Sequence, residues 1–599
     1  MKKMKLKIRY LNGNRLFYAF LAGGNAVIHD QSYLNRINVF PVPDGDTGTN
    51  LASTFRAIAE GAEAKRSIKE TLRSIANAAL YGAQGNSGLI FAQFLHGMSK
   101  EVGNHEWMLT TKAFGESVKR ATQHAYAAIV HPVEGTMITV IREWAEAVCQ
   151  KAAQTADFEE LFSESLAAAQ KSLRETPLKL AVLAKANVVD AGAKGFVDFL
   201  EGILQFIKKG KLLRVQKTEL EWAPPDEIKA PSKDKSLHNR YCSEALLVGT
   251  DMEIGGIRSV VQRYGDSAVV AGSEERVRIH VHTNEPAGLF FELKDRGTIA
   301  QIKVDDMKKQ YEAVWSPKSR IAILTDSACD LPRSLVDDRQ IHFIPMNIVF
   351  GAQQFLDKMT ILPDRFYDLL QTSKEHPKSA VPPIKSFQNM MAFLSGHYDS
   401  VIAISVSEGL SGTYGAFLKV AQSLTGRRIS VIDSKSISAG EGLLVDRASE
   451  LALAGYPHDE IVRQLESWVP KSRLFVDVLT LKYFIRGGRV SAVKGLAAQI
   501  LSIKPVVSVG PDGKAFNAAK TFSRKGMLAK VLELVRGVAA KDRLWGYAIV
   551  HAQNPERALE YEAALTPLLG MGPRYIMEVS PVIGVHSGVG AAAVALLSE

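Results

Sequence analysis

Residues 38–50 read NVFPVPDGDTGTN, and they carry more information about the fold than any other stretch of the chain. Two carboxylates, Asp44 and Asp46, lie one residue apart in a loop restricted by proline and glycine. Carboxylates so arranged can direct their oxygens at one hard cation, and Mg²⁺ prefers such ligands. A helix expected to begin near Asn50 would point its free N–H groups back at this loop, where anions bind. The alternative is an ordinary Asp-Gly turn with two solvated carboxylates.

The chain around this loop, to about Leu213, has helical periodicity. Apolar residues recur every three or four positions, as in Leu51, Phe55 and Ile58, which places them on one side of a helix. Ala-rich stretches such as WAEAVCQKAAQ favour helix, and alternating β-branched residues are scarce. A bundle of helices is expected here.

Three more glycine-containing motifs follow in this helical part. They are Gly85-Asn86-Ser87-Gly88, His131-Pro-Val-Glu-Gly-Thr136-Met137 and Val189-Asp190-Ala-Gly192-Ala-Lys-Gly195. Each motif alone could be a glycine-containing connection between helices. None is a GxxxxGK[ST] phosphate-binding loop.

Taken in order with residues 38–50, these motifs resemble the DhaL-like family over about the first 210 residues. That family comprises the nucleotide-binding subunits of dihydroxyacetone kinases and the ATP-binding component of bacterial fatty acid kinases. The form NVFPVPDGDTGTN looks closer to the fatty acid kinase branch. The resemblance implies a closed barrel of antiparallel helices that binds ATP together with two Mg²⁺ ions.

The same resemblance assigns roles to individual residues. Asp44 and Asp46 would hold the paired Mg²⁺ ions and act as catalytic residues. The family often has a third acidic ligand shortly before this pair, and the nearest match is Asn38, a neutral oxygen donor. The expected nucleotide contacts are Thr47, Thr49, Asn50, Gly85, Asn86, Ser87, Gly88, Thr136, Met137, Asp190 and Gly192.

Changes in composition divide the rest of the chain. Residues 213–239 are rich in proline, lysine, aspartate and serine, which is typical of a linker. Short strand and helix patterns then predict a small α+β domain at 240–316, and alternating strand and helix patterns predict an α/β domain at 319–599. The helical domain before the linker is assigned to residues 1–212.

Two histidines share one face of the clearest strand in the α+β domain, VRIHVH. The apolar residues of this strand face one way, and Arg278, His280 and His282 face the other. With Cys242, the histidines could supply three ligands to Zn²⁺ and leave a fourth position open. The alternative is a pair of surface histidines and a buried thiol.

This segment also resembles the middle domain of the fatty acid kinase ATP-binding component, through His280-Val-His-Thr-Asn284-Glu-Pro. The resemblance favours the zinc interpretation. A further interpretation has one histidine, assigned to His282, meeting the transferred phosphoryl group as a catalytic residue.

From Arg320 onward, apolar strand patterns alternate with helical patterns, as in IAILTDS, VIAISVS, ISVIDS, YAIVHA and PVIGVHS. This part resembles the DegV family, which binds fatty acids in a tunnel between two lobes. The matching residues are Thr325-Asp326-Ser327, Ser407-Glu-Gly-Leu-Ser411-Gly412-Thr413-Tyr414, Ile432-Asp433-Ser434, Arg486-Gly-Gly-Arg489, Ile503-Lys504-Pro505, Asp512-Gly513 and Gly584-Val-His586-Ser-Gly588-Val-Gly590.

Junctions near Ser411 and His586 are expected to place a hydroxyl, backbone donors and an imidazole beside helix N-termini, where an anion is favoured. They could also be only glycine-rich loops. Two positions depart from the family pattern: Ser379-Ala-Val-Pro382-Pro383 replaces a TSQPS-type segment, and an expected arginine is replaced around Phe522, with Arg524 close by. The expected lipid contacts are Ser327, Ser379, Ser411, Gly412 and His586.

Composition limits the classes of function. The net charge is +10, but basic residues are spread along the chain, so we expect no nucleic-acid partner. The charge fits a mild attraction to anionic membranes, as peripheral contact, or to acidic proteins. The three cysteines are odd in number and widely spaced, which indicates a reducing, cytoplasmic setting.

The two resemblances together imply a fatty acid kinase that phosphorylates the carboxylate of a long-chain fatty acid held in the DegV-like domain. Its acyl phosphate product could pass to a downstream acyltransferase, and a homodimer is expected. Three alternatives stay open: a lipid carrier or sensor that binds nucleotide without turnover, a dihydroxyacetone-type polyol kinase, and a kinase that its DegV-like part only regulates.

Overall fold

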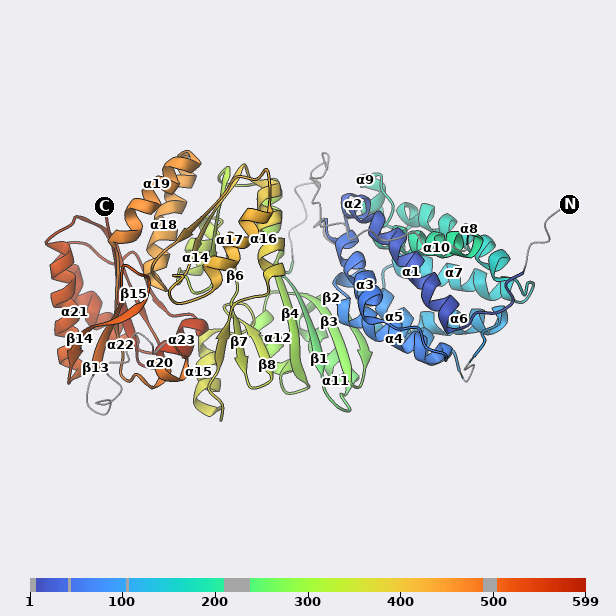
Figure 1. Ribbon diagram of the computed structural model, residues 1–599, viewed down its shortest axis with the longest axis horizontal. Coiled ribbons are helices and arrows are strands. Elements are labelled where there is room, and N and C mark those ends of the chain that lie inside the picture. The colour runs from blue at the N-terminus through green and yellow to red at the C-terminus, as the bar shows by residue number, and fades with distance from the viewer. Residues whose placement is uncertain (1–6, 41–44, 104–106, 210–237, 489–503) are drawn as a thin grey trace. The chain divides into compact units, whose positions relative to one another are not determined.

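The computed structural model describes residues 7–40, 45–103, 107–209, 238–488 and 504–599. It divides into two compact units, Met1–Lys308 and Lys309–Glu599, which are described separately (Figure 1). In the described part of the chain, no helix is both long enough and apolar enough to cross a membrane. The predicted linker 213–239 lies outside the described residues except for its last two positions, and the predicted domain bounds stay predictions.

The first unit begins with a bundle of helices (Figure 1). Their apolar stripes meet in one core, in which Phe55, Phe91 and Phe199 pack with ring centroids 4.9–5.3 Å apart. This core confirms the predicted helical domain. The helices are α1 (Gly13–His29), α2 (Gln31–Arg36), α3 (Thr47–Gly61), α4 (Ile68–Gly82), α5 (Gly85–Glu101), α6 (Thr111–Ala128), α7 (Met137–Ala152), α8 (Phe158–Lys179), α9 (Ala181–Ala186) and α10 (Ala191–Lys209).

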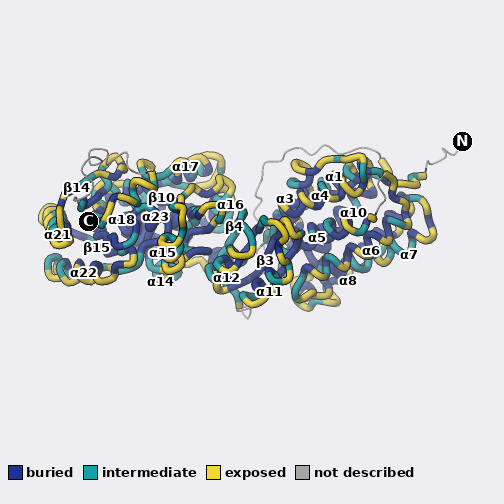
Figure 2. Tube along the Cα trace, turned by 90° about the horizontal axis from the view of Figure 1, so that it is seen from below, coloured by how far each residue is buried: buried dark blue, intermediate teal, exposed yellow. Residues whose placement is uncertain are grey.

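Glycines let α1 and α10 approach closely. A Cβ atom at Gly202 of α10 would lie 2.6 Å from the Ala22 carbonyl oxygen of α1, and one at Gly23 would lie 2.5 Å from the Phe199 ring. Larger side chains would separate the two helices. In the packed bundle, the inner sides of the helices are buried and the outer sides are exposed (Figure 2).

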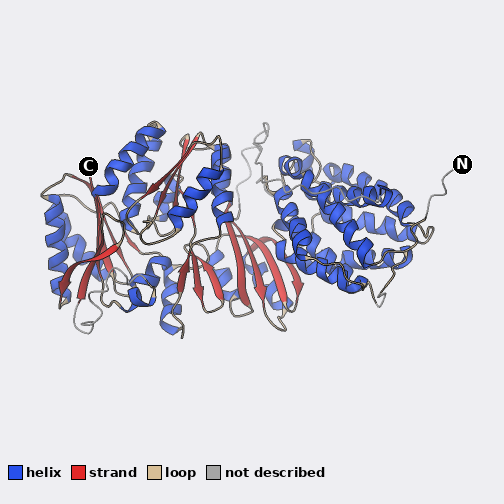
Figure 3. Cartoon of the chain, in the orientation of Figure 1, coloured by secondary structure: helices blue, strands red, loops and turns tan. Residues whose placement is uncertain are grey.

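A four-stranded antiparallel sheet completes the first unit, in the order β2-β3-β1-β4 (Figure 3). One face packs Val277, Ile279 and Val281 against α11 and α12. The other side adjoins the helical bundle, where the Gly272 N–H donates to Gln93 Oε1 at 2.8 Å. The elements are β1 (Tyr241–Val248), α11 (Ile254–Tyr264), β2 (Gly265–Ser273), β3 (Arg276–Thr283), α12 (Pro286–Leu293) and β4 (Thr298–Asp306), followed by α13 (Met307–Trp315).

The second unit has two lobes. The first contains a parallel sheet ordered β11-β10-β5-β6 and an antiparallel sheet ordered β8-β7-β9. The strands are β5 (Ile321–Asp326), β6 (His342–Ile344), β7 (Asn347–Phe350), β8 (Gln353–Leu356), β9 (Lys378–Ala380), β10 (Ser400–Ser405) and β11 (Ile429–Asp433). The helices of this region are α14 (Arg333–Asp338), α15 (Pro363–Thr372), α16 (Ile384–His397), α17 (Thr413–Ser423), α18 (Ala439–Leu453) and α19 (His458–Trp468).

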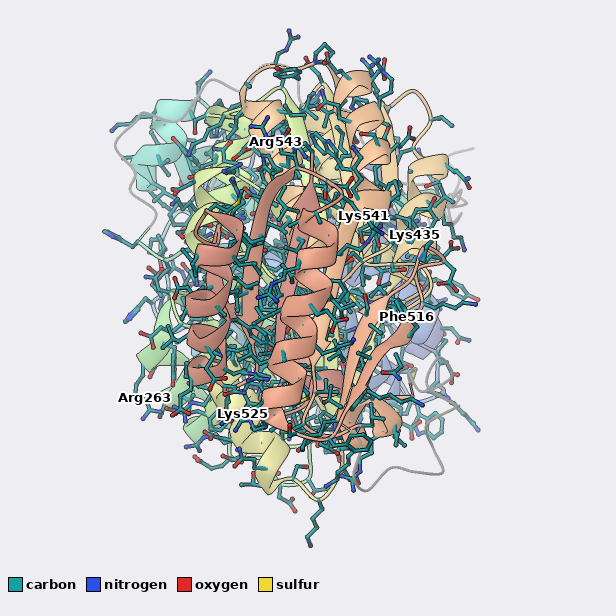
Figure 4. All side chains as sticks on the ribbon, turned by 90° about the vertical axis from the view of Figure 1, so that its left-hand side faces the viewer. Arg263, Lys435, Phe516, Lys525, Lys541 and Arg543 are labelled. Atoms are coloured by element: carbon teal, nitrogen blue, oxygen red, sulfur yellow. The ribbon has the colours of Figure 1, made fainter. Side chains whose placement is uncertain are left out.

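A six-stranded mixed sheet, β14-β13-β12-β17-β15-β16, forms the second lobe. Helices α21 (Arg524–Ala539) and α22 (Pro555–Leu569) cover the face that carries Phe475, Tyr547 and Val594. Figure 4 shows α21 beside Phe516 of the edge strand β14, with Lys525 in its first turn. The strands are β12 (Ser472–Asp477), β13 (Lys504–Val509), β14 (Ala515–Thr521), β15 (Leu544–His551), β16 (Ile576–Glu578) and β17 (Ala592–Ser598), and α20 (Lys482–Arg486) follows β12.

One predicted strand is wrong. The segment PVIGVHS forms helix α23 (Pro581–Ser587). Pro581 stands at the start of this helix, where its missing N–H costs no hydrogen bond, and the Gly584 N–H donates to the Ser580 carbonyl at 2.9 Å. The other four quoted patterns lie on β5, β10, β11 and β15, and the three predicted fold types are confirmed.

Candidate active site and apolar cavity

Of the two aspartates predicted to hold Mg²⁺, the structure describes one. Asp44 lies outside the described residues, whereas Asp46 is the N-cap residue of α3. Helix α3 begins at Thr47, three residues before the predicted start. Asp46 is close enough to Lys303 of the sheet to help raise the pKa of that ammonium group against the opposing effect of burial. Asp46 therefore lies near the sheet as well as at the start of a helix of the bundle.

Helix α3 is fixed by polar contacts to α2. Thr49 Oγ1 accepts hydrogen bonds from Asn35 Nδ2 at 2.9 Å and Gln31 Nε2 at 3.2 Å, and the Thr49 N–H donates to Asn35 Oδ1. Asn50 is buried beside Gly85, where a Cβ atom would lie 2.5 Å from Asn50 Nδ2. Gly85 also has a φ of +62°, so this turn requires glycine. Asn38, the predicted third Mg²⁺ ligand, is buried.

The separated glycine motifs converge on one region. A Cβ atom at Gly192 would lie 2.6 Å from Ser87 Oγ and 3.3 Å from Met137 Cβ. Gly88, in the first turn of α5, lies close to Thr54 of α3. Thr136 is the N-cap residue of α7, and its hydroxyl donates to the Val133 carbonyl. Three of the four predicted nucleotide motifs therefore meet at the start of α5, α7 and α10.

Two polar side chains in this region differ in their partners. Asp190 caps α10 by accepting a hydrogen bond from the Ala193 N–H at 2.8 Å, and burial raises the pKa of Asp190 to about 6. Asn86 Oδ1 is buried and makes no hydrogen bond to any described residue. Buried amide oxygens rarely lack a partner, so Asn86 Oδ1 offers a hydrogen-bond acceptor that a ligand could use.

The three predicted zinc ligands come together. Cys242 and His282 are paired across β1 and β3, and the ligand atoms of Cys242, His280 and His282 all lie within 4.8 Å of one another. Two imidazoles and a thiol in this spacing fit Zn²⁺. Burial lowers the pKa of His282 to about 3, which keeps this imidazole neutral at pH 7.

The alternative of surface histidines is wrong. His280 is 3% exposed and His282 is 7% exposed, because this face of the sheet adjoins the helical bundle. The alternation of VRIHVH correctly predicts which side chains share a face. The polar face is nevertheless buried, because it packs against the helical domain. A polar cluster in such a place needs partners, which a metal ion would supply.

Glu244 and Lys303 were missed by the sequence predictions. The Gly85 N–H donates to Glu244 Oε1 at 2.7 Å, and His280 Nδ1 lies 3.1 Å from the same oxygen. Burial alone would raise the pKa of Glu244, but the hydrogen bond from His280 and the charge of Lys303 lower it to about 2. The available signal was the two-residue spacing from Cys242, which places Glu244 on the same face of a strand.

A large cavity lies between the two lobes of the second unit. It holds about 1080 Å³, including its opening to solvent. Apolar side chains from both lobes make up most of its lining, among them Leu410, Val476, Val507, Val550, Val582 and Ile583. The face of the six-stranded sheet opposite α21 and α22 packs partly against α18 and supplies part of this lining.

Few polar groups line this cavity, and two of them lie together. Ser379 Oγ of β9 and His586 Nε2 of α23 are 2.9 Å apart, within hydrogen-bonding distance. Gly487 packs on the imidazole, because a Cβ atom there would lie 2.2 Å from His586 Nδ1. Ser411 also lines the cavity and lies 2.8 Å from the Thr413 hydroxyl at the start of α17.

Two predicted lipid contacts, Ser327 and Gly412, do not line the cavity. Ser327 does not line the cavity, because its buried hydroxyl accepts a hydrogen bond from the Met346 N–H. Gly412 is the N-cap residue of α17, next to Ser411. His586 lies in the last turn of α23, so its predicted place beside a helix N-terminus is wrong. Phe522, 75% exposed, and Arg524 are also outside the cavity lining.

Family comparisons match three consecutive parts of the chain. Residues 41–205 match the DAK2 domain, and residues 238–314 match the FakA-like middle domain of fatty acid kinases. Residues 320–599 match the family described as "Uncharacterised protein, DegV family". Consecutive parts of the chain are thus similar to a DAK2 domain, a FakA-like middle domain and the DegV family. The predicted DhaL-like and DegV resemblances are thereby confirmed, and the sheet of the first unit lies in the part that matches the FakA-like middle domain.

The curated relatives match only part of their own length. A protein of Staphylococcus saprophyticus, named only as uncharacterized, is 33% identical over 319 residues, which cover 51% of this chain and 56% of the relative. An uncharacterized protein of Staphylococcus aureus strain USA300 is 32% identical over 322 residues, covering 51% of this chain and 58% of the relative. The chain thus spans between half and two thirds of these relatives.

Similar solved structures are DegV proteins. DegV of Bacillus subtilis, described as a fatty acid binding protein, is 26% identical, covers 47% of this chain and all of its own, and has a TM-score of 0.44. A fatty acid binding DegV family protein of Streptococcus agalactiae is 25% identical, covers 47% of this chain and 99% of its own, and has a TM-score of 0.44.

Proposed function

We propose that this chain is a fatty acid kinase, which transfers the γ-phosphoryl group of ATP to the carboxylate of a long-chain fatty acid. The products are an acyl phosphate and ADP. The observation that carries the proposal is the apolar cavity of the DegV domain with its Ser379–His586 pair, in the same chain as DAK2 and FakA-like domains. A mostly apolar cavity in which a hydroxyl and an imidazole lie together suits a lipid with a single charged end.

The reaction needs no general base. A fatty acid carboxylate, with a pKa near that of Glu, about 4.3, is already ionised at pH 7. It attacks the γ-phosphorus directly, and the bond between that phosphorus and the β–γ bridging oxygen breaks. Catalysis then rests on orienting the reactants and on stabilising charge.

The residues of the DAK2 domain would orient the nucleotide. Asp46 would hold Mg²⁺ together with Asp44, and the ions would neutralise charge on the transferred and leaving oxygens. The Asn86 amide and Ser87 hydroxyl, in the first turn of α5, would donate hydrogen bonds to phosphate oxygens. The donor set of Cys242, His280 and His282 fits Zn²⁺, which would polarise an oxygen or stabilise the middle domain.

Fusion would make delivery of the lipid intramolecular. A linker of suitable length gives the second domain an effective concentration on the order of millimolar. Cytoplasmic location, peripheral membrane contact, a downstream acyltransferase and a homodimer remain predictions.

The test is direct chemical trapping of the product. Purified full-length chain is incubated with ATP, Mg²⁺ and a panel of fatty acids, and hydroxylamine converts acyl phosphate into acyl hydroxamate. We expect hydroxamate with the wild type and a loss of at least about 100-fold with Asp46→Ala, since charge stabilisation is the main source of catalysis. Asp295→Ala, which changes an aspartate with a 72% exposed side chain in the same unit, is the matched control.

Bound nucleotide and bound lipid without any hydroxamate would contradict the kinase and favour the carrier or sensor. Phosphorylation of dihydroxyacetone with no effect of fatty acids would favour the polyol kinase instead.

A further inference from the structure

Glu244 occupies the middle of the polar face of the sheet. It lies on the central strand β1, paired with His280 of β3 on one side and Lys303 of β4 on the other. Directly paired residues of antiparallel strands share a face, so the three side chains form a row. Glu244 is 1% exposed, which makes it a buried carboxylate flanked by an imidazole and an ammonium group.

The same carboxylate reaches the DAK2 domain. Glu244 Oε1 accepts from the Gly85 N–H at 2.7 Å, and His280 Nδ1 lies 3.1 Å away. One oxygen thus contacts both the turn that begins α5 and a member of the histidine–cysteine cluster. Its second oxygen, Oε2, is buried and makes no hydrogen bond to the described residues.

These contacts link two groups of residues that the proposed function treats separately. Gly85 opens the turn that carries Asn86 and Ser87, which would contact phosphate. His280 belongs to the cluster that fits Zn²⁺. A carboxylate at the N-terminus of a 17-residue helix is favoured by the helix dipole. Losing either neighbour would leave a buried charge partly unpaired, so the position of the turn depends on the position of the imidazole.

We propose that Glu244 is a positioning residue that couples the Cys242–His280–His282 cluster to the Gly85 turn, so that metal binding and nucleotide binding strengthen each other. This inference rests on the proposed function, which assigns the nucleotide to that turn. A metal ion held by the cluster restricts the imidazole of His280. Glu244 then holds the turn in the arrangement that receives phosphate. Coupling of this kind is reciprocal, because both ligands bias one equilibrium.

The test measures coupling in the full-length chain stripped of metal. ADP with Mg²⁺ is titrated by calorimetry, with and without saturating Zn²⁺. In the wild type, Zn²⁺ raises the affinity for ADP by about fivefold or more, the lower end of usual allosteric coupling. In Glu244→Ala, ADP and Zn²⁺ each still bind, but the ratio of the two ADP affinities falls to about one.

Glu244→Gln keeps an oxygen that can accept from the Gly85 N–H but loses the charge that holds His280. Its coupling is expected between those of the wild type and Glu244→Ala, because neutral acceptors hold their donors less strongly. Glu275→Gln, an exposed residue of the β2–β3 turn in the same sheet, keeps the full wild-type ratio. Hydrogen exchange of the amides in the first turn of α5 gives a second readout, slowed by Zn²⁺ in the wild type only.

Independent binding of ADP and Zn²⁺ to the wild type overturns this inference alone, as does an unchanged ratio in Glu244→Ala. If Glu244→Ala does not fold, an unchanged ratio in Glu244→Gln has the same meaning. A wild type that binds no ADP overturns the proposed function and this inference together.

Discussion

Ser379 and His586 are the two polar groups of the cavity that lie within hydrogen-bonding distance of each other. We predict that Ser379→Ala weakens binding of palmitate by about fivefold, since a lost hydrogen bond costs roughly 1 kcal/mol. The substitution removes one donor to the carboxylate and one partner of the imidazole. Calorimetric titration of the full-length chain measures the effect.

A second serine–histidine pair supplies the control. Ser430 Oγ and His458 Nε2 are 2.8 Å apart in the same domain, but neither residue lines the cavity. Ser430→Ala should therefore leave the affinity for palmitate unchanged. Equal affinities for the wild type and Ser379→Ala would show that the carboxylate binds elsewhere.

We predict that Asp357 makes the stability of the DegV domain depend on pH. It is fully buried and accepts a hydrogen bond from the Val582 N–H of α23 at 3.1 Å. Burial raises the pKa of Asp357 to about 7, against the opposing charge of Lys358, whereas the unfolded chain has the usual value of about 3.9. Between these values the folded state holds a proton that the unfolded state has lost. The contribution of protonated Asp357 to the free energy of unfolding is therefore complete at pH values below about 4, and it is lost as the pH rises to about 7.

Asp357→Asn should make stability less dependent on pH. Between pH 5 and 8, the melting temperature of the wild type is expected to fall more steeply than that of the variant. The transition to follow is the one that palmitate raises, since ligand binding identifies the DegV domain. Asp326 of the same domain also has a pKa raised by burial, to about 6, so only the difference between the two proteins reports on Asp357. Parallel curves would contradict this prediction.

The residues of the candidate sites were predictable to different degrees. Period-two alternation placed His280 and His282 on one face, and the structure brings both to Cys242. The contact between Gly85 and Glu244 was not predictable, because it joins residues 159 positions apart in two domains. Ser327 was assigned through a motif, but its hydroxyl serves the backbone of Met346.

At the scale of elements, α23 fixes the position of His586. A Cβ atom at Gly584 would lie 2.6 Å from the Phe366 ring of α15 and 3.1 Å from the Tyr367 hydroxyl. We predict that Gly584→Ala displaces α23, lowers stability by about 1–3 kcal/mol and weakens palmitate binding, since both aromatic side chains are fully buried. Thermal unfolding and calorimetry measure the two effects.

Gly537→Ala in α21 is the matched control, because a Cβ atom there meets nothing within 4 Å. Because Gly537 lies within a helix, we expect Gly537→Ala to leave the stability of the domain unchanged or to raise it by about 0.4–1 kcal/mol. Similar effects of the two substitutions would mean that close packing does not hold α23.

Most elements could be predicted from periodicity, and the exceptions have physical causes. PVIGVHS alternates apolar residues like a strand, but Ser580 and Pro581 begin a helix there and its packing on α15 outweighs the alternation. Helix α3 begins at Thr47 because the Asn50 N–H already donates to the Asp46 carbonyl at 2.8 Å, although the Asp46 side chain makes no cap hydrogen bond.

At the scale of the whole molecule, the order of the domains was predictable because each has its own composition and motifs. The burial of the polar sheet face was not, since it depends on a neighbouring domain that local patterns do not describe. The first unit contains the Cys/His cluster and the second unit contains the apolar cavity, and the proposed reaction assigns the nucleotide to the first and the lipid to the second.

The most direct measurement loads the full-length chain with one equivalent of palmitate, removes free lipid, adds ATP with Mg²⁺ and follows acyl hydroxamate formation at several protein concentrations. A self-contained fatty acid kinase gives hydroxamate with a first-order rate constant that does not change on dilution. No hydroxamate at any concentration, with palmitate and nucleotide both bound, would contradict a fatty acid kinase; a rate constant proportional to protein concentration would contradict phosphorylation within one chain.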